Sequence, residues 1–107
     1  MAVAADKQVV DQKIQEYLQC LRAHQVPVWR AYLFGSYVKN AAHSDSDIDL
    51  AVFLDRDEID GFQDDVALMR YRREIDLRIE PHAFARTDYD SSDPFIREII
   101  TTGERLV

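Results

Sequence analysis

Two short motifs in the sequence carry side chains that could do chemistry together. Gly35-Ser36 follows an apolar stretch, and after ten further residues, positions 37 to 46, the pair Asp47 and Asp49 opens a second apolar stretch. Side chains alternate along a strand, so these two aspartates would share one face, with Cα atoms roughly 6.7 Å apart. Two such carboxylates repel each other unless a cation neutralises them, and their hard oxygens favour Mg²⁺ or Mn²⁺. The aspartates are therefore candidate metal ligands.

Gly35-Ser36 is a candidate phosphate-binding turn. Glycine permits a tight turn and a close approach of the backbone to a ligand. A short helix beginning at Ser36 would present its free N–H groups and the hydroxyl to an anion. Lys39 could contact a phosphate, although a single lysine in a loop is more often only solvated. A phosphate-binding turn beside carboxylates that hold metal is the combination that transfer of a nucleotidyl group from a triphosphate requires.

A third carboxylate is expected from the polar stretch that precedes Pro81. A strand over Ile75–Ile79 that ends near this proline would place its even-numbered, polar positions on one face. We expect Asp76 to join the aspartate pair from this strand, bind one metal ion and accept the proton of the attacking hydroxyl. Glu74 and Glu80 are alternatives, but a glutamate beside a helix end or a proline fits a surface role.

The elements that must position these residues follow from hydrophobic periodicity. The predicted order begins with a helix over 7–23 and a strand over 28–34, followed by a polar or helical stretch to about 42. A strand over 47–54, a charged loop over 55–60 and a helix from 62 to about 73 come next. The strand described above and a last helix complete the order. Asp93 is placed to cap that helix, Pro94 to start it and Gly103 to end it, and Leu106 with Val107 could add an edge strand. We expect one domain over residues 1–107, an α/β or α+β fold with a small mixed sheet and helices packed on one face.

The run LFGSYVKNAAHSDSDIDLAV resembles the GS-x10-DxD signature of the polymerase-β-like nucleotidyltransferase superfamily, with the same spacing. The small size and the later EIDLRIEP resemble the minimal nucleotidyltransferases of bacteria and archaea, and the resemblance covers about residues 10 to 105. It implies the polymerase-β-like fold, ATP or another nucleoside triphosphate as donor, and Mg²⁺ or Mn²⁺. In one departure, Asn40 stands where the family often has glycine, but asparagine tolerates a left-handed turn better than most residues.

The resemblance also implies a partner. Many minimal nucleotidyltransferases are antitoxins paired with an all-helical HEPN-domain toxin, so we expect AMP to be transferred to a tyrosine or similar hydroxyl on such a protein. Because the chain is small, we expect the partner to supply the acceptor surface. Two alternatives stay open: a small-molecule enzyme of the antibiotic-modifying type, for which a homodimer would build the acceptor site, and a non-catalytic antitoxin that binds and occludes its partner.

Composition and residue spacing limit the substrates, the location and the metal sites that the protein can have. The chain has 13 basic and 20 acidic residues and a formal net charge of -7, which disfavours a nucleic-acid substrate because such binders carry a basic face. No apolar run approaches the roughly 20 residues of a membrane helix, and the N-terminus lacks a secretory signal, so we expect a cytoplasmic protein. The three histidines have no zinc-ligand spacing. Four arginines late in the chain fit either a salt-bridged helix face or contact with a partner or phosphate; they are Arg70, Arg72, Arg73 and Arg78.

Overall fold

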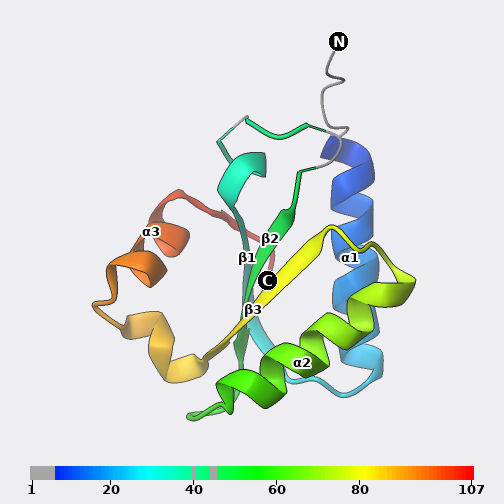
Figure 1. The fold of residues 1–107 in the computed structure, drawn as a ribbon. Coiled ribbons are helices and arrows are strands. Elements are labelled where there is room, and N and C mark those ends of the chain that lie inside the picture. The colour runs from blue at the N-terminus through cyan, green and yellow to red at the C-terminus, as the bar shows by residue number, and fades with distance from the viewer. Residues whose placement is uncertain (1–6, 40, 44–45) are drawn as a thin grey trace.

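The computed structural model describes residues 7–39, 41–43 and 46–107, and its strands form one mixed sheet between helices (Figure 1). The elements in chain order are α1 (Lys7–Ala23), β1 (Val28–Phe34), the 3-10 turn η1 (Gly35–Tyr37), β2 (Ile48–Leu54), α2 (Gly61–Tyr71), η2 (Arg72–Glu74), β3 (Ile79–Ala85), η3 (Arg86–Asp90), α3 (Pro94–Thr102) and β4 (Glu104–Arg105). The strand order is β3-β2-β1-β4, with β2 and β3 parallel and the other neighbours antiparallel. The expected fold class is confirmed.

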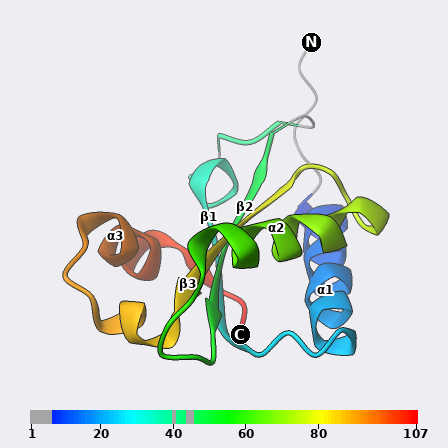
Figure 2. The same ribbon diagram turned by 60° about the horizontal axis from the view of Figure 1, so that its bottom comes forward.

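The sheet separates two apolar layers, because side chains alternate between its faces. The larger layer packs α1 and α2 on one face, and its buried side chains include Ile14, Leu33, Leu50, Val52 and Ile79. The smaller layer packs α3 on the other face, and its buried side chains are Tyr32, Ala51, Phe53, Ile96 and Ile99. The expected layer of helices on one face therefore holds α1 and α2, whereas α3 lies against the opposite face (Figures 1 and 2).

Local sequence signals account for the N-terminal starts of α2 and α3. The carboxylate of Asp60 accepts the Gln63 N–H at 2.9 Å and caps α2. Asp93 caps α3 in the same way, and its predicted start at Pro94 is confirmed. No described helix is long and apolar enough to span a membrane. The C-terminal edge strand was predicted at Leu106 and Val107, but the paired residues of β4 lie just before them.

The prediction of the third strand is wrong. β3 begins at Ile79, where the predicted strand over Ile75–Ile79 would end, and it continues through Pro81 to Ala85. The polar and apolar alternation before it belongs to η2 and a turn, in which Leu77 is 65% exposed. Pro81 is tolerated inside β3 because the strand lies at the edge of the sheet, where a missing N–H breaks no ladder on its outer side.

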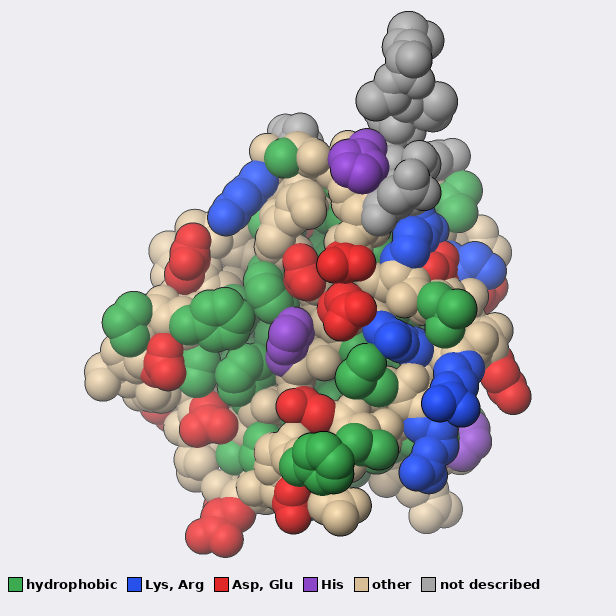
Figure 3. Space-filling view, in the orientation of Figure 1, with side chains coloured by type: hydrophobic (Ala, Val, Ile, Leu, Met, Phe, Trp, Pro, Cys, Tyr) green, Lys and Arg blue, Asp and Glu red, His purple; other side chains and the backbone are tan. Residues whose placement is uncertain are grey.

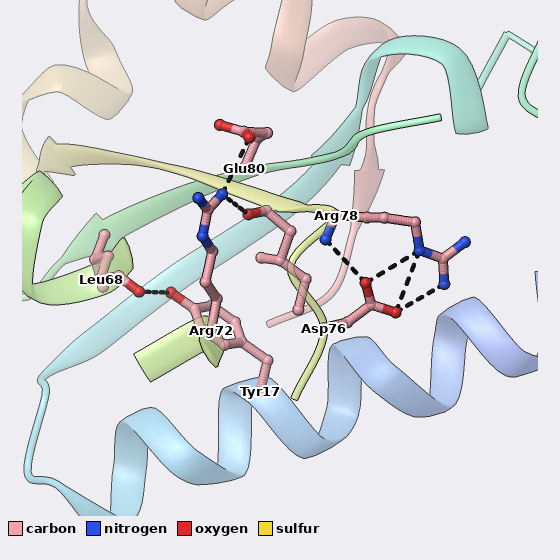
Figure 4. Close-up of polar contacts among 7 residues, drawn as sticks. Tyr17, Leu68, Arg72, Asp76, Arg78 and Glu80 are labelled. Carbon is pink, nitrogen blue, oxygen red and sulfur yellow. Dashed lines mark hydrogen bonds and ion pairs between the residues drawn. The ribbon is translucent and has the colours of Figure 1, made fainter. Parts of the chain in front are cut away.

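One buried hydrogen bond ties the two helices of the larger layer together. The hydroxyl of Tyr17 in α1 is fully buried and donates to the carbonyl oxygen of Leu68 in α2 at 2.6 Å (Figure 4). Removing a buried donor takes this hydrogen bond from the Leu68 carbonyl in a place that water does not reach, so the loss is not offset by solvation.

We expect Tyr17→Phe to lower the free energy of unfolding by about 1–3 kcal/mol, measured by urea denaturation. The matched control is Tyr71→Phe, because the half-buried Tyr71 contacts His24 only through its ring. The control should change stability by no more than about 0.5 kcal/mol. Equal effects of the two substitutions would contradict the assignment.

Candidate active site

Three strand ends meet at one edge of the sheet. β1 ends there at Phe34, whereas β2 and β3 begin there. The register pairs Phe34 with Asp49, and Asp49 with Glu80. Directly paired residues of neighbouring strands direct their side chains to the same face. Phe34, Asp49 and Glu80 therefore form a row across three strands.

The row lies on the face that α3 partly covers. Ile48 and Leu50 are buried in the α1–α2 layer, as the alternation predicted, so Asp49 faces the other way. Asp47, which precedes β2, is exposed. On β3, the ring of His82 lies 5.6 Å from that of Phe34, centroid to centroid, which puts the even-numbered positions of β3 on the same face.

Asp49 lies in an acidic environment. Burial raises the pKa of the Asp49 carboxyl above its ordinary value, His82 opposes the shift, and the charges of Asp47 and Glu80 add to it. Figure 3 shows several acidic side chains gathered beside a histidine in the middle of the view. A divalent cation would remove this repulsion, and three carboxylates are the hard oxygen donors that Mg²⁺ and Mn²⁺ prefer. These residues therefore fit such an ion.

The carboxylates are nevertheless not drawn into a compact cluster. Among the described residues, no three His, Cys, Asp or Glu side chains are arranged so as to hold a metal ion as they stand. Glu80 is instead paired with an arginine. Arg72 donates through Nη1 to Oε1 of Glu80 at 3.0 Å and to the Ile79 carbonyl at 2.7 Å (Figure 4). Arg72 thus fixes one carboxylate oxygen of Glu80 beside β3.

Gly35 packs directly against Asp49. Its φ of +79° lies in the left-handed region that favours glycine, and a Cβ at this position would collide with the Asp49 carboxylate. The predicted turn at Gly35-Ser36 is one 3-10 turn, anchored by the buried Tyr37. The exposed Lys39 follows the turn. Asn40, the departure from the family pattern, lies outside the described residues.

Asp76 is not brought together with the other two aspartates. It precedes β3, and its carboxylate accepts the Arg78 backbone N–H at 2.9 Å and the Nη2 of the same residue at 2.7 Å. The hydrogen bond from Arg78 lowers the pKa of Asp76, and Lys13 on α1 also favours its ionised form. Asp76 and Glu80 lie on opposite sides of the β3 ribbon (Figure 4). Participation of Asp76 in the chemistry stays a prediction.

Glu80 was named from the sequence only as an alternative to Asp76, and Arg72 only as one of four clustered arginines; the pairing of the two is seen first in the structure. The signal was present, because Glu80-Pro81-His82 has the same polar-apolar-polar order as Asp47-Ile48-Asp49. The strand was assigned one segment too early, so Asp76 was preferred. Of the four arginines, Arg72 and Arg78 bind Glu80 and Asp76, respectively, in salt bridges.

Two hollows flank the sheet edge. One of about 340 Å³ lies beside α2 and is lined by Val66, Met69, Arg70, Arg72, Arg73 and Leu77. The other, of about 200 Å³, lies between the end of β1 and α3 and includes Gly35 and Lys39 among its lining residues. The second hollow adjoins the candidate site.

This mixed sheet carries the carboxylates of Asp49 and Glu80 and the glycine-serine turn at the same edge. A nucleotidyltransferase domain has this arrangement. The family model described as Polymerase beta, Nucleotidyltransferase matches residues 12–107, and the chain belongs to this family. The match includes Gly35, Ser36, Asp47 and Asp49. Comparison with curated proteins and with solved structures gave no match.

Two half-buried aspartates, Asp49 and Asp76, should have opposite effects on stability. Asp76 has a pKa below the ordinary 3.8, so its ion pair stabilises the protein above that pH and the contribution is lost as pH falls through the lowered pKa. Asp76→Asn should therefore cost up to about 1 kcal/mol at pH 7, given solvent screening, and progressively less as pH falls through the lowered pKa. Asp49 has a raised pKa, so its charge destabilises the metal-free protein as pH rises, and Asp49→Asn should stabilise it at pH 7.

Urea denaturation at several pH values in the presence of EDTA measures both effects. Destabilisation by Asp49→Asn at pH 7 without metal would contradict the assigned environment of this carboxyl.

Proposed function

We propose that this nucleotidyltransferase domain transfers AMP from ATP to a hydroxyl group, with Mg²⁺ or Mn²⁺ held by Asp47, Asp49 and Glu80. The close packing of Gly35 against Asp49 is the observation that carries the proposal, since it brings the turn proposed to bind phosphate into contact with a carboxylate proposed to bind metal. Family membership supports nucleotidyl transfer in general. The donor base, the metal and the acceptor are parts of the proposal.

The residues take separate roles in this reaction. Gly35, Ser36 and Lys39 bind the outer phosphates, and the carboxylates hold the ion. When bound, the ion neutralises the triphosphate charge and orients the phosphates. The acceptor oxygen attacks the α-phosphorus, the bond from that phosphorus to the bridging oxygen of the β-phosphate breaks, and pyrophosphate leaves. Glu80 accepts the proton of the acceptor hydroxyl, in the role that the sequence suggested for Asp76.

The proposed acceptor is a hydroxyl, such as a tyrosine, on a helical partner protein of the HEPN type, for which the chain acts as antitoxin. A surface beside α2 supports a protein partner, because large apolar side chains are exposed there next to arginines. The exposed side chains are Phe62, at 76%, and Val66, Met69 and Leu77. Figure 3 shows Lys and Arg side chains grouped on one side of the molecule, so an acidic rim on the partner helix would complement this surface.

Substitution of single carboxylates tests the assignment of roles. We expect Asp49→Asn and Glu80→Gln to lower the rate of AMP transfer by at least about 100-fold, because loss even of an outer-shell partner costs roughly 10–100-fold. Asp76→Asn should leave most of the activity, since this carboxylate is paired with Arg78. The rate is measured by release of pyrophosphate with ATP, Mg²⁺ and the partner protein as acceptor. A severe loss in Asp76→Asn with an active Glu80→Gln would reverse the assignment.

The partner is tested by incubating the chain with ATP, Mg²⁺ and the product of the neighbouring gene, followed by mass spectrometry. Added AMP on the partner supports the proposal, whereas an unmodified partner with untouched ATP would overturn it. Met69→Asp, on the α2 surface, should abolish modification of the partner but keep ATP binding. Transfer to antibiotic-type acceptors by the chain alone would favour the small-molecule enzyme. Protection from the toxin by Asp47→Asn and Asp49→Asn variants would favour occlusion.

A further inference from the structure

The hollow beside α2 carries positive charge that the chain's own acids leave unpaired. Its volume is about 340 Å³, and three apolar side chains and three arginines line it: Val66, Met69, Leu77, Arg70, Arg72 and Arg73. Among the residues that the structure describes, no carboxylate forms a salt bridge with Arg70 or Arg73. The chain as a whole has 20 acidic and 13 basic residues. The hollow is therefore a basic, partly apolar surface on an acidic protein.

Arg72 has hydrogen-bond donors that the chain itself does not use. Its Nη1 donates to the Ile79 carbonyl at 2.7 Å and to Oε1 of Glu80 at 3.0 Å (Figure 4). A guanidinium carries further N–H donors on Nε and Nη2, and within the described ranges of the chain no residue accepts a hydrogen bond from them. The side chain is only 19% exposed, so these donors have limited access to water. The edge formed by Nε and Nη2 matches a carboxylate that binds through both oxygens.

The apolar part of the lining indicates what carries that carboxylate. Val66, Met69 and Leu77 are large apolar side chains exposed to solvent, Leu77 at 65%. Val66, Met69 and Arg70 are three and four positions apart, so they lie on one face of α2. Exposed apolar side chains beside arginines are typical of protein interfaces, whereas a nucleic-acid phosphate requires only the charge. A partner helix with an acid among apolar residues complements both parts of the lining.

We propose that this hollow receives an Asp or Glu side chain of the helical partner protein, whose carboxylate binds the Nε–Nη2 edge of Arg72; this rests on the proposed function. The apolar neighbours of that acid contact Met69 and Leu77. Because Nη1 of Arg72 is bound to the edge strand β3, a partner anchored here lies beside the strand that carries Glu80. The anchor thereby brings the acceptor protein to the edge of the candidate site.

The first test measures binding of the partner without ATP or metal. The product of the neighbouring gene is titrated into the full chain, and the dissociation constant is measured by calorimetry. Arg72→Lys keeps the positive charge and can still pair with Glu80, but it lacks the two parallel N–H donors. It should weaken binding roughly tenfold or more, as loss of a hydrogen bond to a charged group does. The control is Arg97→Lys on α3, exposed on the opposite face of the sheet, which should change nothing.

A double-mutant cycle separates this contact from a general loss of structure. Each Asp and Glu of the partner is replaced by Ala and titrated into the unsubstituted chain and into Arg72→Lys. One of these acids should cost roughly tenfold with the unsubstituted chain and little with Arg72→Lys, because the two groups are in contact. Leu77→Glu removes no buried side chain and should also weaken binding, since it places a like charge at the hollow.

The outcomes distinguish this anchor from the proposed function. If no acid of the partner couples to Arg72 and Leu77→Glu binds as tightly as the unsubstituted chain, the anchor is wrong, while AMP transfer to the partner would still support the proposed function. If the partner neither binds nor gains AMP, both fail. A dimer of the chain that Leu77→Glu dissociates would show that a second copy occupies the hollow and would overturn the anchor. Single-stranded RNA that binds the unsubstituted chain but not Arg72→Lys would overturn it as well.

Discussion

The contact between Gly35 and the Asp49 carboxylate is the constraint on which the rest of the site depends. A residue with a side chain would be strained at position 35, because of its left-handed backbone and because its Cβ would displace the Asp49 carboxylate. The contact brings the end of β1 and the start of β2 close enough for one ligand to touch the turn and the carboxylates together. It also helps to bury Asp49, and that burial raises its pKa. A bound cation, as the proposed function requires, would relieve this cost.

One face of the sheet carries most of the buried core, and the other face carries the candidate site. The α1–α2 face holds the larger buried layer, in which even Tyr17 is fully enclosed. The other face is covered by α3 only in part, so Asp49, Glu80 and His82 stay accessible beside the smaller layer. Grouping three acids in one place destabilises a folded chain, and the packing of the opposite face offsets that cost. Function is thus concentrated where the second layer is incomplete.

Sequence alone predicted most of the fold because its signals are local. The stripe over Lys7–Ala23, the apolar run of β1 and the cap at Asp93 each contain their own physical cause. The spacing from Gly35 to Asp49 was informative for the same reason, since a hairpin-like pair of strands brings its two ends together. The neighbour of Asp49 on β3 was not predictable in this way. It depends on the register between β2 and β3, which pairs Asp49 with Glu80 and is set by tertiary packing.

A crystal structure of the chain with Mn²⁺ and a non-hydrolysable ATP analogue tests the central claim most directly, because anomalous scattering locates the metal. The account predicts manganese coordinated by carboxylates from β2 and β3, among them Asp49 and Glu80, with the outer phosphates against Gly35 and Ser36. Manganese bound away from this edge of the sheet, or a triphosphate that makes no contact with the turn, would contradict it.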